Sequence, residues 1–295
     1  MVYLRATIGV LSSVRMPSIR RLAKAVSVPA GGAVPPGMSV ARTNLPPYEE
    51  CLMANKSDDV CGFLPKIDAH SPQGTLGRLK LSELMPTQNA VGMDEVNEKV
   101  AKIKDKTGSA LEDYLLPRAV PVIIGNGGRY YLIDHHHLSI SLWRAKGDMD
   151  IPVQVTRNWN SLAGKHFWKT MAASNWVYPF DAMGAGPSNP DTLKQHVKDL
   201  DNDLYRSLSW LVREGYGYVK DPNNAIFAEF KWGSFFRTRV IFAAQLTCKK
   251  SCMEMTLADI READPDDYAE KVGYARYLAS SPEAAGLPGF VGRLA

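Results

Sequence analysis

The sequence predicts an α/β protein, of the α+β kind, in which a small mixed sheet with helices is followed by a helical C-terminal portion. Strand-like and helix-like patterns alternate between residues 77 and 156, and apolar residues recur at helical spacing after residue 158. The 295 residues are 45% hydrophobic, which is enough for a sizeable core. No run approaches the roughly 18 consecutive apolar residues of a membrane-spanning helix. We therefore expect a domain over residues 77–156, a helical extension over residues 157–282 packed on it, and no membrane partner.

Residues 1–48 form a basic opening segment. They contain six Lys and Arg and no Asp or Glu, whereas the remainder holds 29 basic and 31 acidic residues. An acid-free segment with Arg and Ser and no long apolar run is typical of a mitochondrial or other organellar transit peptide. A disordered leader of a cytoplasmic protein explains this composition nearly as well. The slightly acidic remainder lacks the basic excess expected of a protein that binds duplex DNA through its phosphates.

The first predicted domain opens with a strand, a turn and a helix. Residues 78–82 alternate like a strand, and residues 86–88 break that pattern. Residues 93–106 carry apolar side chains at helical spacing.

A β-hairpin and a second helix follow. The β-rich runs 121–124 and 129–133 flank Gly125-Asn126-Gly127-Gly128, whose residues tolerate the positive φ angles of a hairpin turn. Asp134 stands at an N-cap position and Gly147 at a C-terminal stop. Residues 151–155 then predict a strand that returns to the sheet.

The C-terminal portion is predicted to be helical, with a turn-rich interruption at residues 178–190. The predicted helices cover residues 159–174, 192–199, 204–214, 225–246 and 265–280. Aromatic and basic side chains are interleaved here, which suits nucleobase stacking but also an ordinary helical core. We favour the core interpretation and keep Arg206, Lys220 and Lys231 as candidates for lining a site.

The four cysteines are too few and too irregularly spaced for a disulfide framework or a zinc site, so we expect free thiols. They are Cys51, Cys61, Cys248 and Cys252.

Asp134 and three consecutive histidines form the strongest candidate site. Backbone N–H groups and the positive end of the helix dipole favour an anion at a helix N-terminus. His135, His136 and His137 would add side-chain donors, more strongly when protonated. The alternative is that Asp134 is only a cap and the histidines are ordinary surface residues.

A metal interpretation of the same triplet meets a geometric obstacle. Consecutive helical residues diverge by about 100°, so three adjacent histidines cannot converge on one ion. If the segment were extended, His135 and His137 could act as a pair, with His166 or Asp134 as a third ligand.

Several segments together resemble the ParB/sulfiredoxin superfamily, specifically its ParB-like nuclease branch. The similarity spans roughly residues 77–245 and rests on residues 83–92, the hairpin, residues 132–138, and residues 176–181, 204–208 and 228–232. The resemblance implies a ParB/sulfiredoxin-like fold and phosphate chemistry at the start of the helix after the hairpin.

The resemblance also implies residue roles, some of which this sequence lacks. Nucleotide-binding relatives carry a Gly-x-[His/Arg]-Arg turn, whose positions here are His135 to Leu138, so the Gly and the last Arg are replaced. The free-serine kinases of the superfamily use a Glu where Gln88 stands, and an amide is no general base. No Cys occurs in the His turn, so sulfiredoxin-type chemistry is not expected.

These observations lead to a phosphate-directed enzyme as the first hypothesis. It would be a nuclease, phosphodiesterase or phosphotransferase acting on a small phosphate-containing substrate, a nucleotide or nucleic acid. The assigned residues are His136 and His137 for proton transfer and Asp134, His135, Thr87 and Gln88 for the phosphate.

Two alternatives remain open. One is a metal-dependent His-Asn-His nuclease using His136, Asn158 and His166; the other is a ParB-fold binding or scaffold module without catalysis. DNA partitioning ranks lower, since no helix-turn-helix with a basic face is evident. The cofactor, a nucleotide or a divalent metal if there is one, and the oligomeric state are left open by the sequence.

Overall fold

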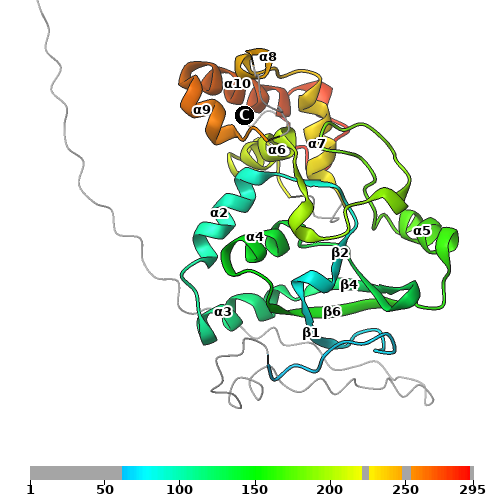
Figure 1. Cartoon of the computed structure of the whole chain (residues 1–295). Coiled ribbons are helices and arrows are strands. Elements are labelled where there is room, and N and C mark those ends of the chain that lie inside the picture. The colour runs from blue at the N-terminus through cyan, green and yellow to red at the C-terminus, as the bar shows by residue number, and fades with distance from the viewer. Residues whose placement is uncertain (1–61, 221–225, 248–253, 293–295) are drawn as a thin grey trace, which may run out of the picture. The chain divides into compact units, whose positions relative to one another are not determined.

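The computed structural model describes residues 62–220, 226–247 and 254–292 (Figure 1). All of these belong to one compact unit, Pro47–Ala295. The predicted basic leader and the four cysteines lie outside the described residues.

A five-stranded mixed sheet forms the base of the α/β part. In spatial order its strands are β1 (Leu76–Lys80), β6 (Asp150–Asn158), β4 (Val120–Gly125), β5 (Arg129–Leu132) and β2 (Leu84–Pro86). β1 pairs with β6 and β4 with β5 in antiparallel fashion, whereas β4–β6 and β2–β5 are parallel. The predicted hairpin is confirmed, with Gly127 and Gly128 at φ angles of 75° and 70° in its turn.

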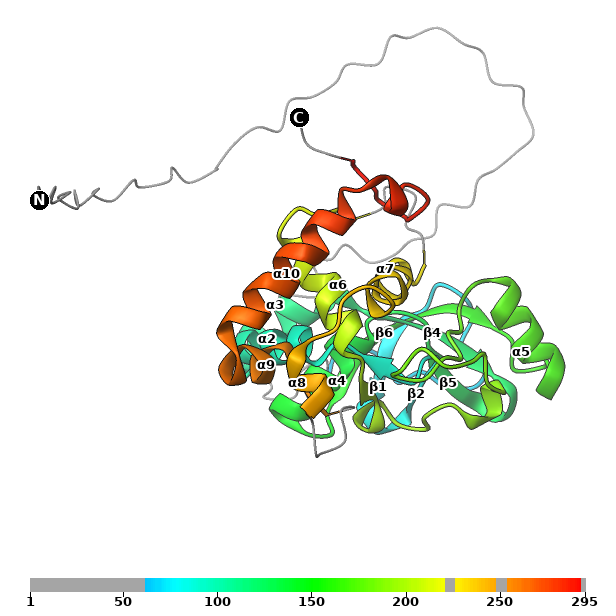
Figure 2. The same ribbon diagram turned by 90° about the horizontal axis from the view of Figure 1, so that it is seen from above.

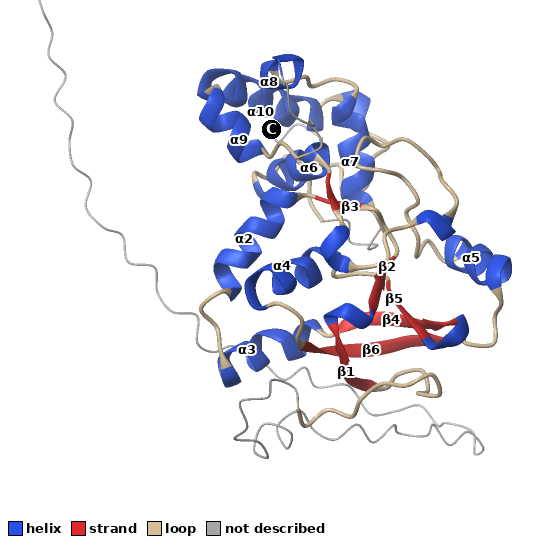
Figure 3. Ribbon diagram, in the orientation of Figure 1, coloured by secondary structure: helices blue, strands red, loops and turns tan. Residues whose placement is uncertain are grey.

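Helices cover both faces of this sheet (Figure 3). They are α2 (Met93–Ile103), α3 (Gly108–Leu115), α4 (His136–Lys146) and α5 (Gly164–Ala173). Side chains alternate along β4, so Val122 and Ile124 pack with α3 and α4 while Ile123 packs with α5. The helices predicted at 93–106 and after Asp134 are confirmed, and α3 was not predicted.

A helical layer follows the sheet in the chain (Figure 2). It contains α6 (Leu204–Glu214), α7 (Ala228–Arg237), α8 (Ala243–Thr247), α9 (Leu257–Ala263) and α10 (Pro265–Ala279). Its core confirms the core interpretation for two aromatics, since Tyr218 and Trp232 are buried and stacked with ring centroids 4.2 Å apart. Tyr216, by contrast, is 79% exposed.

Two helix predictions were wrong. The predicted helix 192–199 contains only single 3-10 turns, Pro190–Thr192 and Val197–Asp199, because Leu193 has an extended backbone (ψ 153°) and Val197 is anchored in the core of the sheet. The predicted helix 225–246 is divided into α7 and α8, since the chain leaves helical geometry after Thr238.

A small parallel sheet joins the two parts of the fold. It pairs β3 (Ala90–Val91), just before α2, with β7 (Asp201–Asn202), just before α6. α2 therefore begins beside α6, and side chains from both helices meet there. None of the helices in the described part combines the length and apolar character needed to cross a bilayer.

Candidate functional site

The loop between β2 and α2 packs against the start of α4. The backbone N–H of Thr87 donates to Nε2 of His136 at 3.2 Å, and its hydroxyl donates to the Leu132 carbonyl at 2.9 Å. Gln88 is 3% exposed and its amide donates to the Ala90 carbonyl. Thr87 and Gln88 thus hold the loop together through their side chains, and the expectation that they face a phosphate stays a prediction.

His136 and His137 are buried hydrogen-bond acceptors. Nε2 of His137 accepts from the backbone N–H of Gly92 at 3.0 Å, as Nε2 of His136 does from Thr87. A backbone N–H can only donate, so in each ring Nε2 carries no proton. Burial lowers the pKa of each imidazole to about 3. Both rings are therefore neutral near pH 7, and their predicted role in proton transfer stays a prediction.

His135, rather than Asp134, occupies the N-cap position of α4. Its backbone is left-handed (φ 65°, ψ 24°), and the Asp134 carboxylate accepts from the N–H of His135 instead of from the first turn. The predicted cap at Asp134 is thus wrong by one residue. His135 occupies the position where nucleotide-binding relatives are expected to carry Gly. Its left-handed backbone is a conformation that Gly accepts more easily than any other residue does.

The first turn of α4 keeps free backbone donors. The N–H groups of His136, His137 and Leu138 have no hydrogen-bond acceptor among the described residues, and the earliest helical bond is Ser139 N–H to the His135 carbonyl. The His135 imidazole likewise has no hydrogen bond within the described part of the chain. Burial lowers its pKa, although the Asp134 charge opposes this.

A buried ionic cluster adjoins this turn from α2, α6 and α7. Glu95 Oε2 lies 3.5 Å from His137 Nε2 and 3.2 Å from Arg206 Nη2, and Glu95 Oε1 accepts from Lys99 at 2.8 Å. Arg206 also lies 4.0 Å from Glu229, which pairs with Arg213.

Two atoms of this cluster have unused bonding capacity. Glu95 Oε2 and Arg206 Nη1 are buried without a hydrogen bond among the described residues. Burial raises the pKa of Glu95, but the positive charges of Arg206 and Lys99 oppose burial and hold the pKa below its usual range. Glu95 therefore stays ionised, and a buried guanidinium N–H beside the start of α4 remains available to an anion.

Among the other predicted site residues, Lys220 lies near the start of α4, whereas Lys231 and His166 do not join the cluster. Lys220 is exposed and lies close enough to His135 to lower its pKa. Lys231 is exposed on α7 and makes no contact with the cluster among the described residues, and His166 is exposed on α5. No group of three His, Cys, Asp or Glu in the described ranges could hold a metal, so the combination of His135, His137 and His166 is not assembled.

The His-Asn-His order does not form a cluster either. The amide of Asn158 donates to the carbonyls of Ala69 and Ser71, at the end of the hairpin where Asn158 aligns with Ile124. His136 follows the opposite end of β5 and is bound to the loop after β2.

Comparison with known proteins identifies the family. A protein family described as "Putative ParB-like nuclease" matches residues 78–238. The chain belongs to the ParB-like nuclease family. A solved structure, the protein Atu1540 from Agrobacterium tumefaciens, superposes with a TM-score of 0.61 at 31% sequence identity, covering 75% of this chain and 98% of that one. A search of curated proteins found no match.

The ParB-like chain has one site residue that sequence reasoning missed. Glu95 looks like the first member of an ordinary surface i,i+4 pair with Lys99, and only the packing of α6 on α2 makes it 8% exposed. The signal in the sequence was its position three residues after Gly92, in the first turn of the helix that follows the family's first motif. Arg206, kept as a candidate from the sequence, is the partner that brings Glu95 into the cluster.

Proposed function

We propose that this ParB-like protein is a phosphate-directed enzyme that cleaves or transfers phosphate esters of nucleotides or nucleic acid, with the phosphate bound at the start of α4. The observation that carries the proposal is the combination of an uncapped first turn and the unpartnered Nη1 of Arg206 beside it. Backbone N–H groups at a helix N-terminus and a guanidinium are both donors suited to phosphate oxygens. A helix end alone would not suffice, but a buried charged donor next to it adds an independent reason.

His135 is the residue to which we assign proton transfer. It has the one imidazole of the three without a hydrogen bond among the described residues, and its lowered pKa keeps it neutral near pH 7. A neutral imidazole can accept a proton from an attacking water or hydroxyl group. The αL backbone at His135 fits this role, since strained conformations of non-glycine residues occur often at functional sites.

His136 and His137 take a positioning role in this proposal. Their Nε2 atoms fix the loop at Thr87 and Gly92, and so hold the first turn of α4 in place against α2. Lys99 and Lys220 add positive charge near the same turn, and they would attract the substrate rather than react with it.

Turnover of bis(p-nitrophenyl) phosphate and of a single-stranded oligonucleotide, with and without divalent metal, tests the proposal. His135→Gly is the most informative variant because Gly accepts the αL backbone, so the imidazole is removed without strain. We expect a loss of about 10²-fold or more in kcat, which is the usual contribution of a general base. Lys169→Gln, an exposed substitution on α5, is the control and should retain full activity.

A binding module without catalysis is the second candidate, favoured by the engagement of two of the three histidines in structural bonds. Thermal unfolding with inorganic phosphate separates the two. Stabilisation by phosphate that is lost in Arg206→Gln, without turnover of either substrate, would support the module. Neither stabilisation nor turnover would overturn both assignments.

A further inference from the structure

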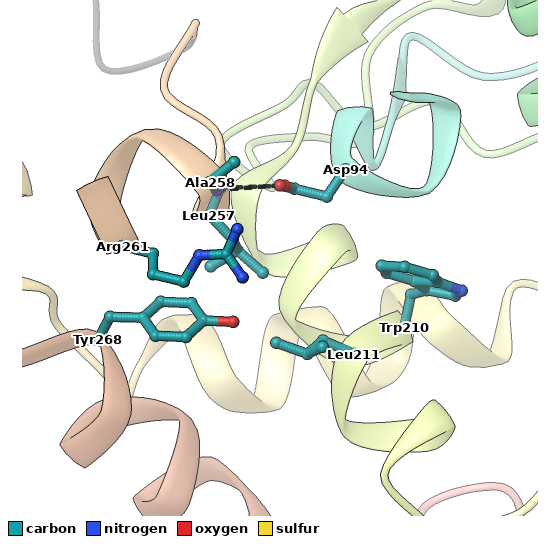
Figure 4. A pocket seen from close by; sticks show the side chains of 7 residues that line it. All are labelled: Asp94, Trp210, Leu211, Leu257, Ala258, Arg261 and Tyr268. Carbon is teal, nitrogen blue, oxygen red and sulfur yellow. Dashed lines mark hydrogen bonds between the residues drawn. The ribbon is translucent and has the colours of Figure 1, made fainter. Parts of the chain in front are cut away.

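A cavity of about 230 Å³ lies where α2, α6, α9 and α10 meet (Figure 4). Asp94 lines it from α2, Trp210 and Leu211 from α6, Leu257 and Arg261 from α9, and Tyr268 from α10. The buried ionic cluster does not contribute to its walls, although Glu95 is the next residue after Asp94.

An exposed cation, Arg261, lines the cavity and has no acidic partner among the described residues. The guanidinium of Arg261 lies over the Tyr268 ring, 6.0 Å from its centroid, and forms no hydrogen bond or ion pair with any described residue. Asp94 is the acidic residue of the lining, but its carboxylate already accepts from the backbone N–H groups of Leu257 (3.0 Å) and Ala258 (3.1 Å). The Asp94 carboxylate therefore caps the start of α9, and Arg261 has no ion-pair partner in the described part of the chain.

The opposite wall of the cavity is formed by the indole of Trp210. Trp210 is partly buried, yet it joins no ring pair and no apolar cluster among the described residues, and its Nε1 has no acceptor there. Figure 4 shows the indole on the far side of the cavity from Arg261 and Tyr268, with Leu211 below. A large aromatic side chain normally packs or hydrogen-bonds when it is withdrawn from water, so this arrangement leaves a face for a ring.

We propose that this cavity is a binding site for a small aromatic carboxylate with a single ring. The carboxylate would accept two parallel hydrogen bonds from the fork of Arg261, and the ring would lie between Trp210 and Tyr268 on the apolar floor of Leu211 and Leu257. The volume limits the ligand to one ring, because drug-sized ligands need cavities of roughly 300 to 1,000 Å³. This site is separate from the start of α4 and does not depend on the proposed function.

Calorimetric titration of the full chain with benzoate tests this proposal. We expect saturable binding with a Kd on the order of 1 mM, as suits a ligand with few atoms. Benzamide, which has the same ring without the charge, should bind at least about tenfold more weakly. Arg261→Gln should weaken benzoate binding by at least about tenfold and Trp210→Leu by several-fold.

Arg239→Gln is the matched control, since Arg239 also lies over an aromatic ring, that of Phe235, but outside the cavity. It should leave benzoate binding unchanged. Arg261 is exposed on its helix, so its substitution leaves the fold intact and the result can be interpreted even if Trp210→Leu is unstable. Absence of saturable benzoate binding, equal binding of benzamide, or unchanged binding in Arg261→Gln would each overturn the proposal.

Discussion

Mild acid should destabilise this fold, because His136 and His137 are buried as neutral acceptors. Each imidazole has a pKa of about 3 in the folded chain and about 6.5 in the unfolded chain. Below pH 6.5 the unfolded state therefore binds protons that the folded state does not. Stability is fully present above pH 6.5 and falls as the pH decreases toward 3.

The magnitude follows from linkage. Between pH 7 and pH 5 each histidine should lower the free energy of unfolding by about 2 kcal/mol, since one pH unit corresponds to about 1.4 kcal/mol per proton. The two together give about 4 kcal/mol, and His135, whose pKa is also lowered, changes stability in the same direction. Carboxylates contribute little in this window because their unfolded pKa values lie near 4.

Urea unfolding followed by circular dichroism at pH 7 and pH 5 measures this difference. His137→Phe removes one titrating ring and should reduce the difference by about 2 kcal/mol. It should also cost about 1–3 kcal/mol at pH 7 through the unpaired N–H of Gly92. Leu142→Val, a core substitution on the same helix, should lose about 1 kcal/mol at both pH values and keep the full difference. Two results would refute the conclusion that His136 and His137 are buried as neutral acceptors. One is an equal free energy of unfolding at pH 7 and pH 5, and the other is an undiminished pH difference in His137→Phe.

Three further substitutions test how the helices are held around the site. Gly92→Ala places a methyl group 2.9 Å from a backbone nitrogen of α6, and should cost about 1–3 kcal/mol in urea unfolding; a neutral result would mean that α2 and α6 are not in close contact. Asp94→Ala removes the acceptor for two N–H groups of α9 and should lower the free energy of unfolding by about 1 kcal/mol. Amide hydrogen exchange in α9 should become faster, and unchanged exchange would contradict the role of Asp94 as a cap. Arg237→Gln leaves Asp203, whose side chain is 3% exposed, without its ion-pair partner, and should lower the free energy of unfolding by about 3–5 kcal/mol. Lys102→Gln, in an exposed ion pair, should lower it by less than about 0.5 kcal/mol. Equal losses in the two variants would contradict the difference in burial.

Secondary structure was predicted correctly where the conformation of a segment depends on its own residues. The hairpin turn with Gly127 and Gly128 and the helix stop at Gly147 follow from φ angles that glycine accepts. The helix 204–214 was predicted from its helical periodicity with the bounds that α6 has, and in the structure Asp203 caps it. The helix expected at 192–199 failed because Val197 is held in the sheet core, a contact that lies outside any sequence window.

The candidate site, too, was predictable from local sequence only in part. From the sequence, the turn after β5 and Arg206 were candidates, because residue types alone indicate which groups can bind an anion. It could not show that His136 and His137 face inward as acceptors, since that depends on the loop from Thr87 to Gly92 lying against α4. Nor could it reveal Glu95, whose charge state depends on its contact with Arg206 from α6.

The sequence by itself determined the family resemblance and the mixed sheet with its hairpin, and it indicated the turn at which we propose an anion site. The tertiary structure alone decided which side chains at that place are free to act. Hydrogen bonding and burial are properties of the packed environment: they neutralise His136 and His137, leave the His135 imidazole without a partner in the described part of the chain, and bring a guanidinium from α6 beside the first turn of α4.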